Sequence, residues 1–311
     1  MITTVTLNPS IDKTVVVDSF IYGGTNRIVD TRIDAGGKGI NLAVAFSQLG
    51  GKARCLGFNY DGGGEVILAA LEKRGINNDF ITLDGDIRIN QKIYDRSKQV
   101  VTELNELGLP PNIDDLSILK KRVVRDSEGS GILVLCGSIP EGVPKTIYRE
   151  LFEAVAHLSI TTVLDAEGDL LREGLKAKPY LIKPNLFELE TVLDEKITSP
   201  YEAAKAAKRL LDDGIKIVCV SLGSDGAVIL DTDEAYYAPG LKVKVRGTTG
   251  AGDSMLAGLC LAHEEGLGLE DMLRYGIAAS TASVMKEGTL LCTKEEFDGM
   301  LPKVRIKRLP A

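Results

Sequence analysis

Short, continuous apolar runs alternate with amphipathic segments along most of the chain. The runs at 53–58, 132–136, 162–165, 180–183 and 215–220 predict buried strands, and residues 3–7 predict a first strand. Apolar residues recur at helical spacing over 39–49, 65–74, 145–157, 188–193 and 201–211, which predicts helices between those strands. Buried strands that alternate with amphipathic helices indicate a doubly wound α/β fold, with a mostly parallel sheet covered by helices on both faces.

A second kind of strand has one polar face. The segments 13–17, 27–33, 88–94 and 99–104 alternate in the manner of half-exposed strands, and the last two form a predicted hairpin around residues 95–98. No linker, repeat or low-complexity segment interrupts the chain. We therefore expect one domain over residues 1–311, with a small β-sheet lid whose strands are inserted at about 13–33 and 88–104.

Composition narrows the functional classes. The chain has 311 residues, 44% hydrophobic and 26% charged, as in an ordinary globular protein, and its net charge of −7 argues against nucleic-acid or acidic-membrane partners. Five scattered cysteines without a C-x-x-C pair favour a reducing compartment. The N-terminus begins as a strand without signal-peptide features, and no apolar run is long enough to span a bilayer, so a cytoplasmic location is expected.

Two glycine-rich turns precede predicted helices. Residues 246–253 join an expected strand at 241–245 to a helix that has Asp253 in its first turn. Free N–H groups and the helix dipole favour an anion at such a turn, and Asp253 could accept a proton from an attacking hydroxyl. Alternatively, Gly250 and Gly252 only turn the chain and Asp253 only favours the helix start. Neither turn fits G-x-G-x-x-G or the P-loop pattern.

The other turn, residues 34–41, offers close backbone approach at Gly36 and Gly37, one cation at Lys38 and an amide at Asn41. This set suits a polyol that carries a phosphate, although a structural helix start explains it equally well. In a doubly wound sheet, the turns after the strands gather at one rim. We therefore expect residues 8–12, 36–41, 136–140, 183–188, 221–226 and 247–253 to lie close together.

Four motifs in order resemble the pfkB (ribokinase-like) family of carbohydrate kinases over the whole chain. They are G-G-K-G-I-N at 36–41, K-P-N-L-F-E at 183–188, S-L-G-S-D-G at 221–226 and T-T-G-A-G-D at 248–253. The sequence departs from many members at Gly247, where Asp, Asn or Ser is common.

The resemblance implies an ATP- and Mg²⁺-dependent sugar kinase and assigns roles to matching positions. Asp253 would be the catalytic base, and Gly250, Ala251 and Gly252 would stabilise charge on the transferred phosphoryl group. Asn185 and Glu188 would hold Mg²⁺, although Glu188 alone fits a first-turn helix carboxylate. ATP would lie against Lys183, Asn185, Ser221, Gly223, Ser224, Gly226 and Thr249. The resemblance leaves a K⁺ requirement open.

The acceptor is expected to be a sugar phosphate. Asp12 and Asn41 would bind sugar hydroxyls, Gly36 and Gly37 would line the sugar, and Ser138 would be a further contact. Arg27, Lys38 and Arg88 singly fit surface charges, and together they suit a substrate phosphate.

Within the family, R-I-N at 88–90 and T-E-L-N at 102–105 look most like the kinases of fructose 1-phosphate. Thr25-Asn26-Arg27 and Gly37-Lys38-Gly39 are shared with tagatose 6-phosphate kinases, and fructose 6-phosphate is a further alternative. The family also implies a homodimer formed through the lid. A non-catalytic sugar-phosphate sensor is the competing class, and the intact Asp253 loop argues against it.

Overall fold

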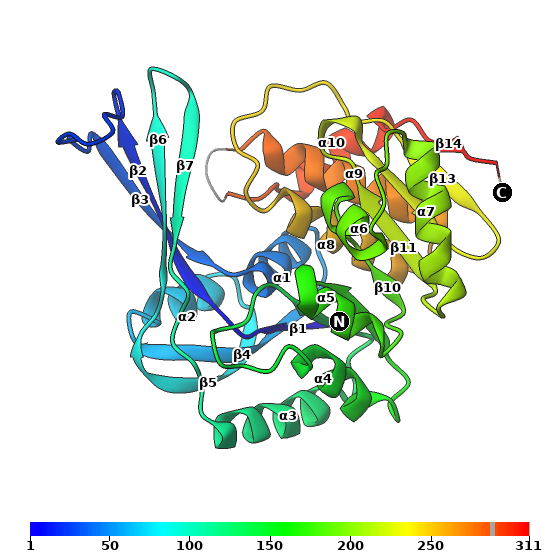
Figure 1. The fold of residues 1–311 in the computed structure, drawn as a ribbon, viewed down its shortest axis with the longest axis horizontal. Helices are drawn as coiled ribbons and strands as arrows, with labels where there is room; N and C mark the ends of the chain where they lie inside the picture. The colour runs from blue at the N-terminus through cyan, green and yellow to red at the C-terminus, as the bar shows by residue number, and fades with distance from the viewer. Residues whose placement is uncertain (287–289, 311) are drawn as a thin grey trace.

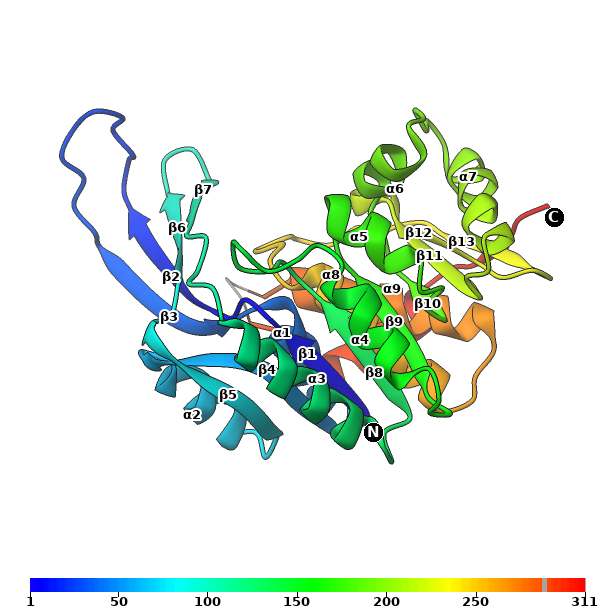
Figure 2. The same ribbon diagram turned by 60° about the horizontal axis from the view of Figure 1, so that its bottom comes forward.

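The computed structural model describes residues 1–286 and 290–310. A 10-stranded sheet forms the body, in the order β14-β13-β12-β11-β10-β9-β8-β1-β4-β5 (Figures 1 and 2). The strands from β5 to β11 are parallel to their neighbours, whereas β12, β13 and β14 continue the sheet antiparallel. Their bounds are β1 Ile2–Thr6, β4 Ala53–Gly62, β5 Asn77–Asp86, β8 Ile132–Cys136, β9 Thr161–Asp165, β10 Leu181–Ile182, β11 Ile217–Ser221, β12 Ala227–Leu230, β13 Ala235–Ala238 and β14 Lys307–Arg308.

Helices cover both faces of this sheet, which buries its central strands. Every residue of β1 and of β8 is buried, as expected from their unbroken apolar or Thr/Val-rich runs. One helical layer contains α3 Ile113–Ser127, α4 Ile147–Val155, α5 Gly168–Leu175, α6 Leu186–Leu193 and α7 Pro200–Asp212. The other contains α1 Lys38–Gln48, α8 Ala251–Glu264, α9 Leu269–Val284 and α10 Lys294–Met300 (Figure 2). The predicted doubly wound α/β fold is confirmed.

A separate 4-stranded sheet, in the order β3-β2-β6-β7, stands beside the body and is called the small sheet below (Figure 1). Its strands are β2 Ser10–Val17, β3 Asp30–Gly36, β6 Ile89–Asp95 and β7 Val100–Asn105. β6 and β7 form the predicted hairpin, and β6 pairs in parallel with β2. Helix α2 Glu65–Glu72 packs near its base, in contact with β3 and β5. The small sheet therefore starts next to the carboxyl end of β1 and borders that rim of the body (Figure 2).

The strand predicted at residues 241–245 is wrong. That segment runs between β13 and α8 outside both sheets, and Val245 is 56% exposed despite the alternating pattern. The physical reason lies in the topology. β13 already pairs with β12 on one side and β14 on the other, so no free edge is left beside it for another strand.

The five cysteines are all free and buried. Among the helices of the described residues, none combines the length and the apolar character needed to cross a membrane.

Candidate active site

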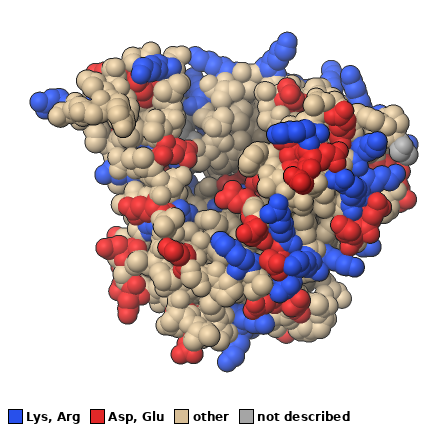
Figure 3. Space-filling model, viewed as in Figure 1, with Lys and Arg blue, Asp and Glu red and all other residues tan. Residues whose placement is uncertain are grey.

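A cavity of about 540 Å³ opens between the body and the small sheet. It is lined by residues at the carboxyl ends of β1, β8, β9, β10 and β11, by the starts of α1 and α8, and by the small sheet. Figure 3 shows the recess between the small sheet at the upper left and the body. The cavity occupies the place where a doubly wound sheet binds its ligands, because the strand-to-helix turns meet there.

Asp253 lies in the first turn of α8 and is only 7% exposed. The preceding Gly250 has φ +75°, a conformation that favours glycine and turns the chain into the helix. Asn41 Nδ2 donates to Asp253 Oδ2 at 3.0 Å. Burial raises the pKa of Asp253 to about 6, even though nearby Lys38 opposes this shift. The carboxylate is therefore ionised at neutral pH and is basic enough to accept a proton.

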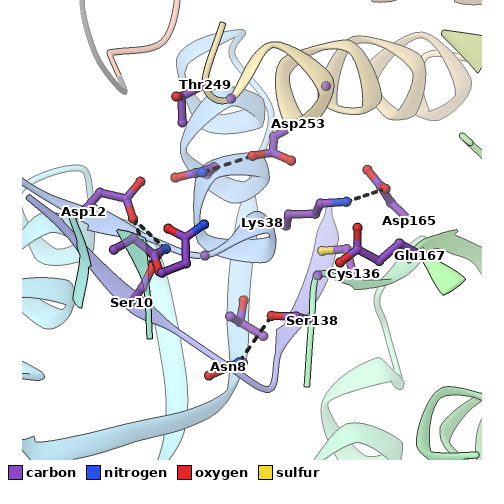
Figure 4. Close-up of a pocket in the computed structure, with 18 of the residues that line it drawn as sticks. Asn8, Ser10, Asp12, Lys38, Cys136, Ser138, Asp165, Glu167, Thr249 and Asp253 are labelled. Carbon is purple, nitrogen blue, oxygen red and sulfur yellow. Dashed lines mark hydrogen bonds and ion pairs between the residues drawn. The ribbon is translucent and has the colours of Figure 1, made fainter. Parts of the chain in front are cut away.

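Asp165, at the end of β9, forms ion pairs with two lysines that line the cavity, Lys183 and Lys38, and Figure 4 shows the pair with Lys38. Lys38 Nζ lies 3.0 Å from Asp165 Oδ1, and Lys183 Nζ lies 3.2 Å from Oδ2. Burial alone would raise the pKa of Asp165, but the ammonium groups of Lys183 and Lys38 outweigh it and lower that pKa. In turn, Asp165 raises the pKa of Lys38 above its ordinary value. The group thus presents two fixed positive charges beside Asp253.

Asn185 and Glu188 form a reciprocal cap at the start of α6. Asn185 Oδ1 accepts the Glu188 N–H at 2.8 Å, and Glu188 Oε2 accepts the Asn185 N–H at 2.8 Å. This N-x-x-E pair is therefore a capping box, and the helix alone explains the residue types. Burial raises the pKa of Glu188, whose other oxygen has no hydrogen-bond partner among the described residues.

No group of three or more His, Cys, Asp or Glu side chains in residues 1–286 and 290–310 could hold a metal ion. The pair still fits Mg²⁺, which keeps several waters and binds one or two carboxylates together with phosphate oxygens. Glu188 can offer its second oxygen to such an ion without losing the cap.

The small sheet contributes a polar network around Asp12, which is 4% exposed. Asp12 Oδ1 accepts from Ser10 Oγ and Asn90 Nδ2, both at 3.1 Å, and Asp12 Oδ2 lies 2.7 Å from Lys92 Nζ. Because Gly36 has no Cβ, the Asp12 carboxylate can lie close to its backbone. A Cβ at Gly36 would lie 2.5 Å from Asp12 Oδ1, a distance that no real side chain tolerates. The Asp12 carboxylate is therefore held in place by Ser10, Asn90 and Lys92, and Asp12 lies in strand β2 and not in a loop.

Comparison with known proteins identifies the site's family. The model of the pfkB family carbohydrate kinases matches residues 5–296. The chain is 36% identical over 310 residues to the 1-phosphofructokinase of Bacillus subtilis, covering 99% of this chain and 100% of that protein. It is 34% identical over 308 residues to the 1-phosphofructokinase of Borreliella burgdorferi, covering 99% and 98%. A crystal structure of phosphofructokinase-2 from Escherichia coli in complex with potassium superposes with a TM-score of 0.92 at 30% identity, covering 97% and 98%.

This chain belongs to the pfkB family of carbohydrate kinases.

Most of the residues singled out in the sequence of this pfkB kinase line the one cavity. They are Asp12, Gly37, Lys38, Asn41, Arg88, Ser138, Lys183, Asn185, Glu188, Ser221, Thr249, Gly250, Gly252 and Asp253. Gly36 lies behind Asp12 instead of facing the cavity. The N–H of Ala251 donates to the Thr248 carbonyl at 3.2 Å, so it helps to form the turn. Gly250 and Gly252 are the loop glycines that face the cavity.

The S-x-G-x-x-G motif continues outward from the cavity. Ser221 lines it and pairs with Asn185 in an isolated β-bridge, which places the two kinase motifs side by side. Beyond Ser221 the chain forms a short 3₁₀ turn, Gly223–Asp225, closed by the Leu222 N–H donating to the Gly226 carbonyl at 2.8 Å. Gly223, Ser224 and Gly226 follow this end of the cavity in the chain but are not among the residues that line it.

The structure places two of the three predicted phosphate-binding cations, Arg88 and Arg27, in very different surroundings. The Arg88 guanidinium donates to the carbonyls of Asn8 (2.9 Å), Pro9 (3.2 Å) and Glu106 (3.2 Å) and to Asn90 Oδ1 (2.9 Å). It lines the cavity but is also the tie between the chain connections at the base of the small sheet. Arg27 is exposed in the loop between β2 and β3, at the far tip of the small sheet, and the structure does not bring it to this chain's cavity (Figure 1).

Sequence reasoning assigned no individual role to Ser10, Asn90, Lys92 and Asp165, all of which line the cavity. Asp165 could have been found, because it ends a predicted buried strand at the rim where ligands bind. Asn90 and Lys92 are two residues apart on β6, so they lie on the same, polar face of the small sheet. The period-two alternation of the sequence is therefore a weak signal for them. Nothing local marks them as partners of Asp12, because that contact depends on the pairing of β6 with β2.

Proposed function

We propose that this pfkB kinase transfers the γ-phosphoryl group of ATP to fructose 1-phosphate and so forms fructose 1,6-bisphosphate. The observation that carries the proposal is one cavity that holds a buried carboxylate of raised pKa, Asp253, together with the fixed ammonium groups of Lys38 and Lys183. The full-length similarity to two 1-phosphofructokinases supports the choice of acceptor. The R-I-N motif at 88–90 and the T-E-L-N motif at 102–105 support it too.

In this proposal Asp253 accepts the proton of the acceptor's free primary hydroxyl. The hydroxyl oxygen then forms a bond to the γ-phosphorus, and the bond from that phosphorus to the oxygen of the departing ADP breaks. The N–H groups of Gly250 and Gly252 and the ammonium of Lys183 stabilise the negative charge on the transferred group. Because these groups are held in place before ATP arrives, little reorganisation is needed in the transition state.

The remaining roles divide the cavity into two ends. Asp12 and Asn41 bind sugar hydroxyls, and Lys38, Arg88 and Ser138 lie where a substrate phosphate can be bound. ATP extends along Lys183, Ser221, Thr249 and the turn of Gly223, Ser224 and Gly226. Asn185 and Glu188 would hold Mg²⁺, which would neutralise phosphate charge. The potassium complex of the Escherichia coli relative favours testing K⁺ as an additional activator.

We further propose that the small sheet acts as a lid and that two chains pair through it. Ile33 (55%), Val100 (49%) and Leu104 (56%) are exposed on one face of this sheet, where a second copy would bury them. Such pairing would also explain why Arg27 lies at the tip of the small sheet, away from the cavity of its own chain. Molar mass by light scattering tests the pairing, and Leu104→Glu should shift the protein to a monomer. An unchanged mass in the variant, or a monomeric wild type, counts against it.

The free, buried cysteines support the predicted cytoplasmic location.

The experiment that tests the function is ADP release in the presence of Mg²⁺ with four acceptors: fructose 1-phosphate, fructose 6-phosphate, tagatose 6-phosphate and fructose. The expected result is the highest kcat/KM with fructose 1-phosphate. Preference for a 6-phosphate would leave the kinase activity in place and reject fructose 1-phosphate as the acceptor. Tight binding of a sugar phosphate without turnover would reject the kinase activity in favour of a non-catalytic sensor. Asp253→Asn is the matched control, because it should keep binding and lose turnover.

A further inference from the structure

Lys92 is a buried lysine whose ammonium faces the acceptor side of the cavity. It lies on β6 and is 6% exposed, a burial that only Lys183 matches among the described lysines. Its Nζ lies 2.7 Å from Asp12 Oδ2 and 3.4 Å from Thr249 Oγ1. Removing an ammonium group from water costs several kcal/mol unless partners compensate for it. The contact with Asp12 supplies that compensation, and the contact with Thr249 joins the small sheet to the loop before Asp253.

The ammonium group has a donor left over. Lysine carries three N–H donors, and Asp12 and Thr249 use two of them. Glu103 lies opposite Lys92 in the β6–β7 register and also lines the cavity, but it forms no ion pair or hydrogen bond within the described residues. The third N–H is therefore available to a molecule in the cavity.

The charges nearby select the kind of group that this donor can bind. Asp12 neutralises Lys92 at 2.7 Å, and the Glu103 carboxylate lines the same wall. A phosphate dianion beside Lys92 would meet two carboxylates, and the Lys92 ammonium is already paired with one of them. A hydroxyl can accept from Lys92 and at the same time donate to Asp12, so the pair suits an alcohol.

We propose that Lys92 is a specificity-determining residue that donates a hydrogen bond to a hydroxyl in the non-phosphorylated part of the acceptor. It also fixes the Asp12 carboxylate that accepts from the same part of the sugar. This inference rests on the proposed function and deepens it, because it states that the wall of the cavity formed by Lys92 and Asp12 takes a neutral hydroxyl and not the substrate phosphate.

The first test is the affinity of the acceptor for Lys92→Met, measured by calorimetry without ATP. Methionine has a similar length and tolerates burial, so the change removes the donor and the charge. A hydrogen bond from a charged group predicts a loss of about 10- to 100-fold in affinity, with a smaller change in the KM for ATP. Lys98→Met is the matched control, because Lys98 is exposed in the turn between β6 and β7. Wild-type acceptor affinity in Lys92→Met overturns the proposal.

The second test separates a hydroxyl contact from a counter-ion role. Analogues of the acceptor that lack the 3- or the 4-hydroxyl are bound by the wild type and by Lys92→Met. The hydroxyl that Lys92 contacts should cost the wild type about 10-fold or more when it is removed, and should cost the variant almost nothing. If every missing hydroxyl costs both proteins equally, Lys92 only neutralises Asp12 and the proposal fails.

Lys92→Met leaves Asp12 buried without its partner, so the variant is at risk of unfolding. The double variant Asp12→Asn/Lys92→Met removes both charges, and thermal unfolding should show that it folds. It should bind the acceptor about 10-fold more weakly than Asp12→Asn alone, whereas a pure counter-ion role predicts equal affinity. All of these measurements use whichever acceptor the wild type turns over best. A changed acceptor therefore rejects fructose 1-phosphate without deciding the role of Lys92.

Discussion

Asp253→Asn should make the protein more stable at neutral pH while it removes most of the activity. The pKa of Asp253 is raised by burial from its ordinary 3.8 to about 6. A raised pKa in the folded state means that folding favours the protonated carboxyl. This contribution to stability is complete below the unfolded pKa near 4 and is lost as the pH rises through about 6. At pH 7 the ionised carboxylate therefore costs the folded state free energy.

The size of this cost follows from the two pKa values. A difference of about two units corresponds to about 3 kcal/mol of unfolding free energy at pH 7, and to roughly half of that at pH 5. Asparagine keeps the shape and can still bond to Asn41, but it carries no charge. A gain of this size in a chain of 311 residues raises the Tm by about 5 °C. Turnover should fall by about 10²–10⁴-fold, because the general base is gone.

Thermal unfolding of the wild type and of Asp253→Asn at pH 7 and pH 5 measures the effect. The matched control is Asp12→Asn in the same cavity, where the expected sign is opposite. Asp12 is paired with buried Lys92 at 2.7 Å, so its loss strands an ammonium group and should lower stability by about 3–5 kcal/mol. The reasoning is refuted if Asp253→Asn is no more stable than the wild type at pH 7, or if its advantage does not shrink at pH 5.

Three further predictions concern the reaction. The kcat/KM should fall tenfold per pH unit below about pH 6, as Asp253 becomes protonated, and the residual rate of Asp253→Asn should not show this fall. A wild-type kcat/KM that stays constant down to pH 5 argues against Asp253 as the base. Gly36→Ala should raise the KM for the acceptor by about 10-fold or more and leave the KM for ATP unchanged, because its Cβ would lie 2.5 Å from Asp12 Oδ1; equal changes in both KM values would indicate general damage instead. Glu188→Gln should keep the capping box, and so the Tm, but need more Mg²⁺ for half-maximal activity; an unchanged Mg²⁺ dependence would leave Glu188 a helix cap only.

The parts of this protein that its sequence predicts are those encoded locally. The continuous apolar run at Ile132–Cys136 is a buried strand with those same bounds, because a strand covered on both faces needs apolar side chains at every position. The turn before α8 was also readable, since Gly250 supplies a positive φ and Asp253 follows at the helix start. Even the gathering of the turns on one rim follows from a general rule of parallel sheets.

The pairing of distant side chains is not encoded locally, and here the folded chain was needed. Lys92 meets Asp12 across 80 residues, and Lys38 meets Asp165 across 127 residues. These contacts depend on which strands become neighbours, and that is a property of the whole fold. The same reason accounts for the wrong strand at 241–245. Its alternating pattern was suitable, but both edges of β13 were already occupied.

Tertiary structure also decides between roles that one motif allows. The sequence allows Glu188 to be a first-turn helix carboxylate, and the family resemblance adds a Mg²⁺ role with Asn185. The structure shows that the two residues cap the helix while one Glu188 oxygen is left for a cation. Arg88 and Arg27 read alike as phosphate-binding cations, yet one ties the base of the small sheet and the other lies at its tip. Residue type limits what chemistry a side chain can perform, whereas its neighbours in space determine which chemistry it performs, because burial and charge act over a few ångströms.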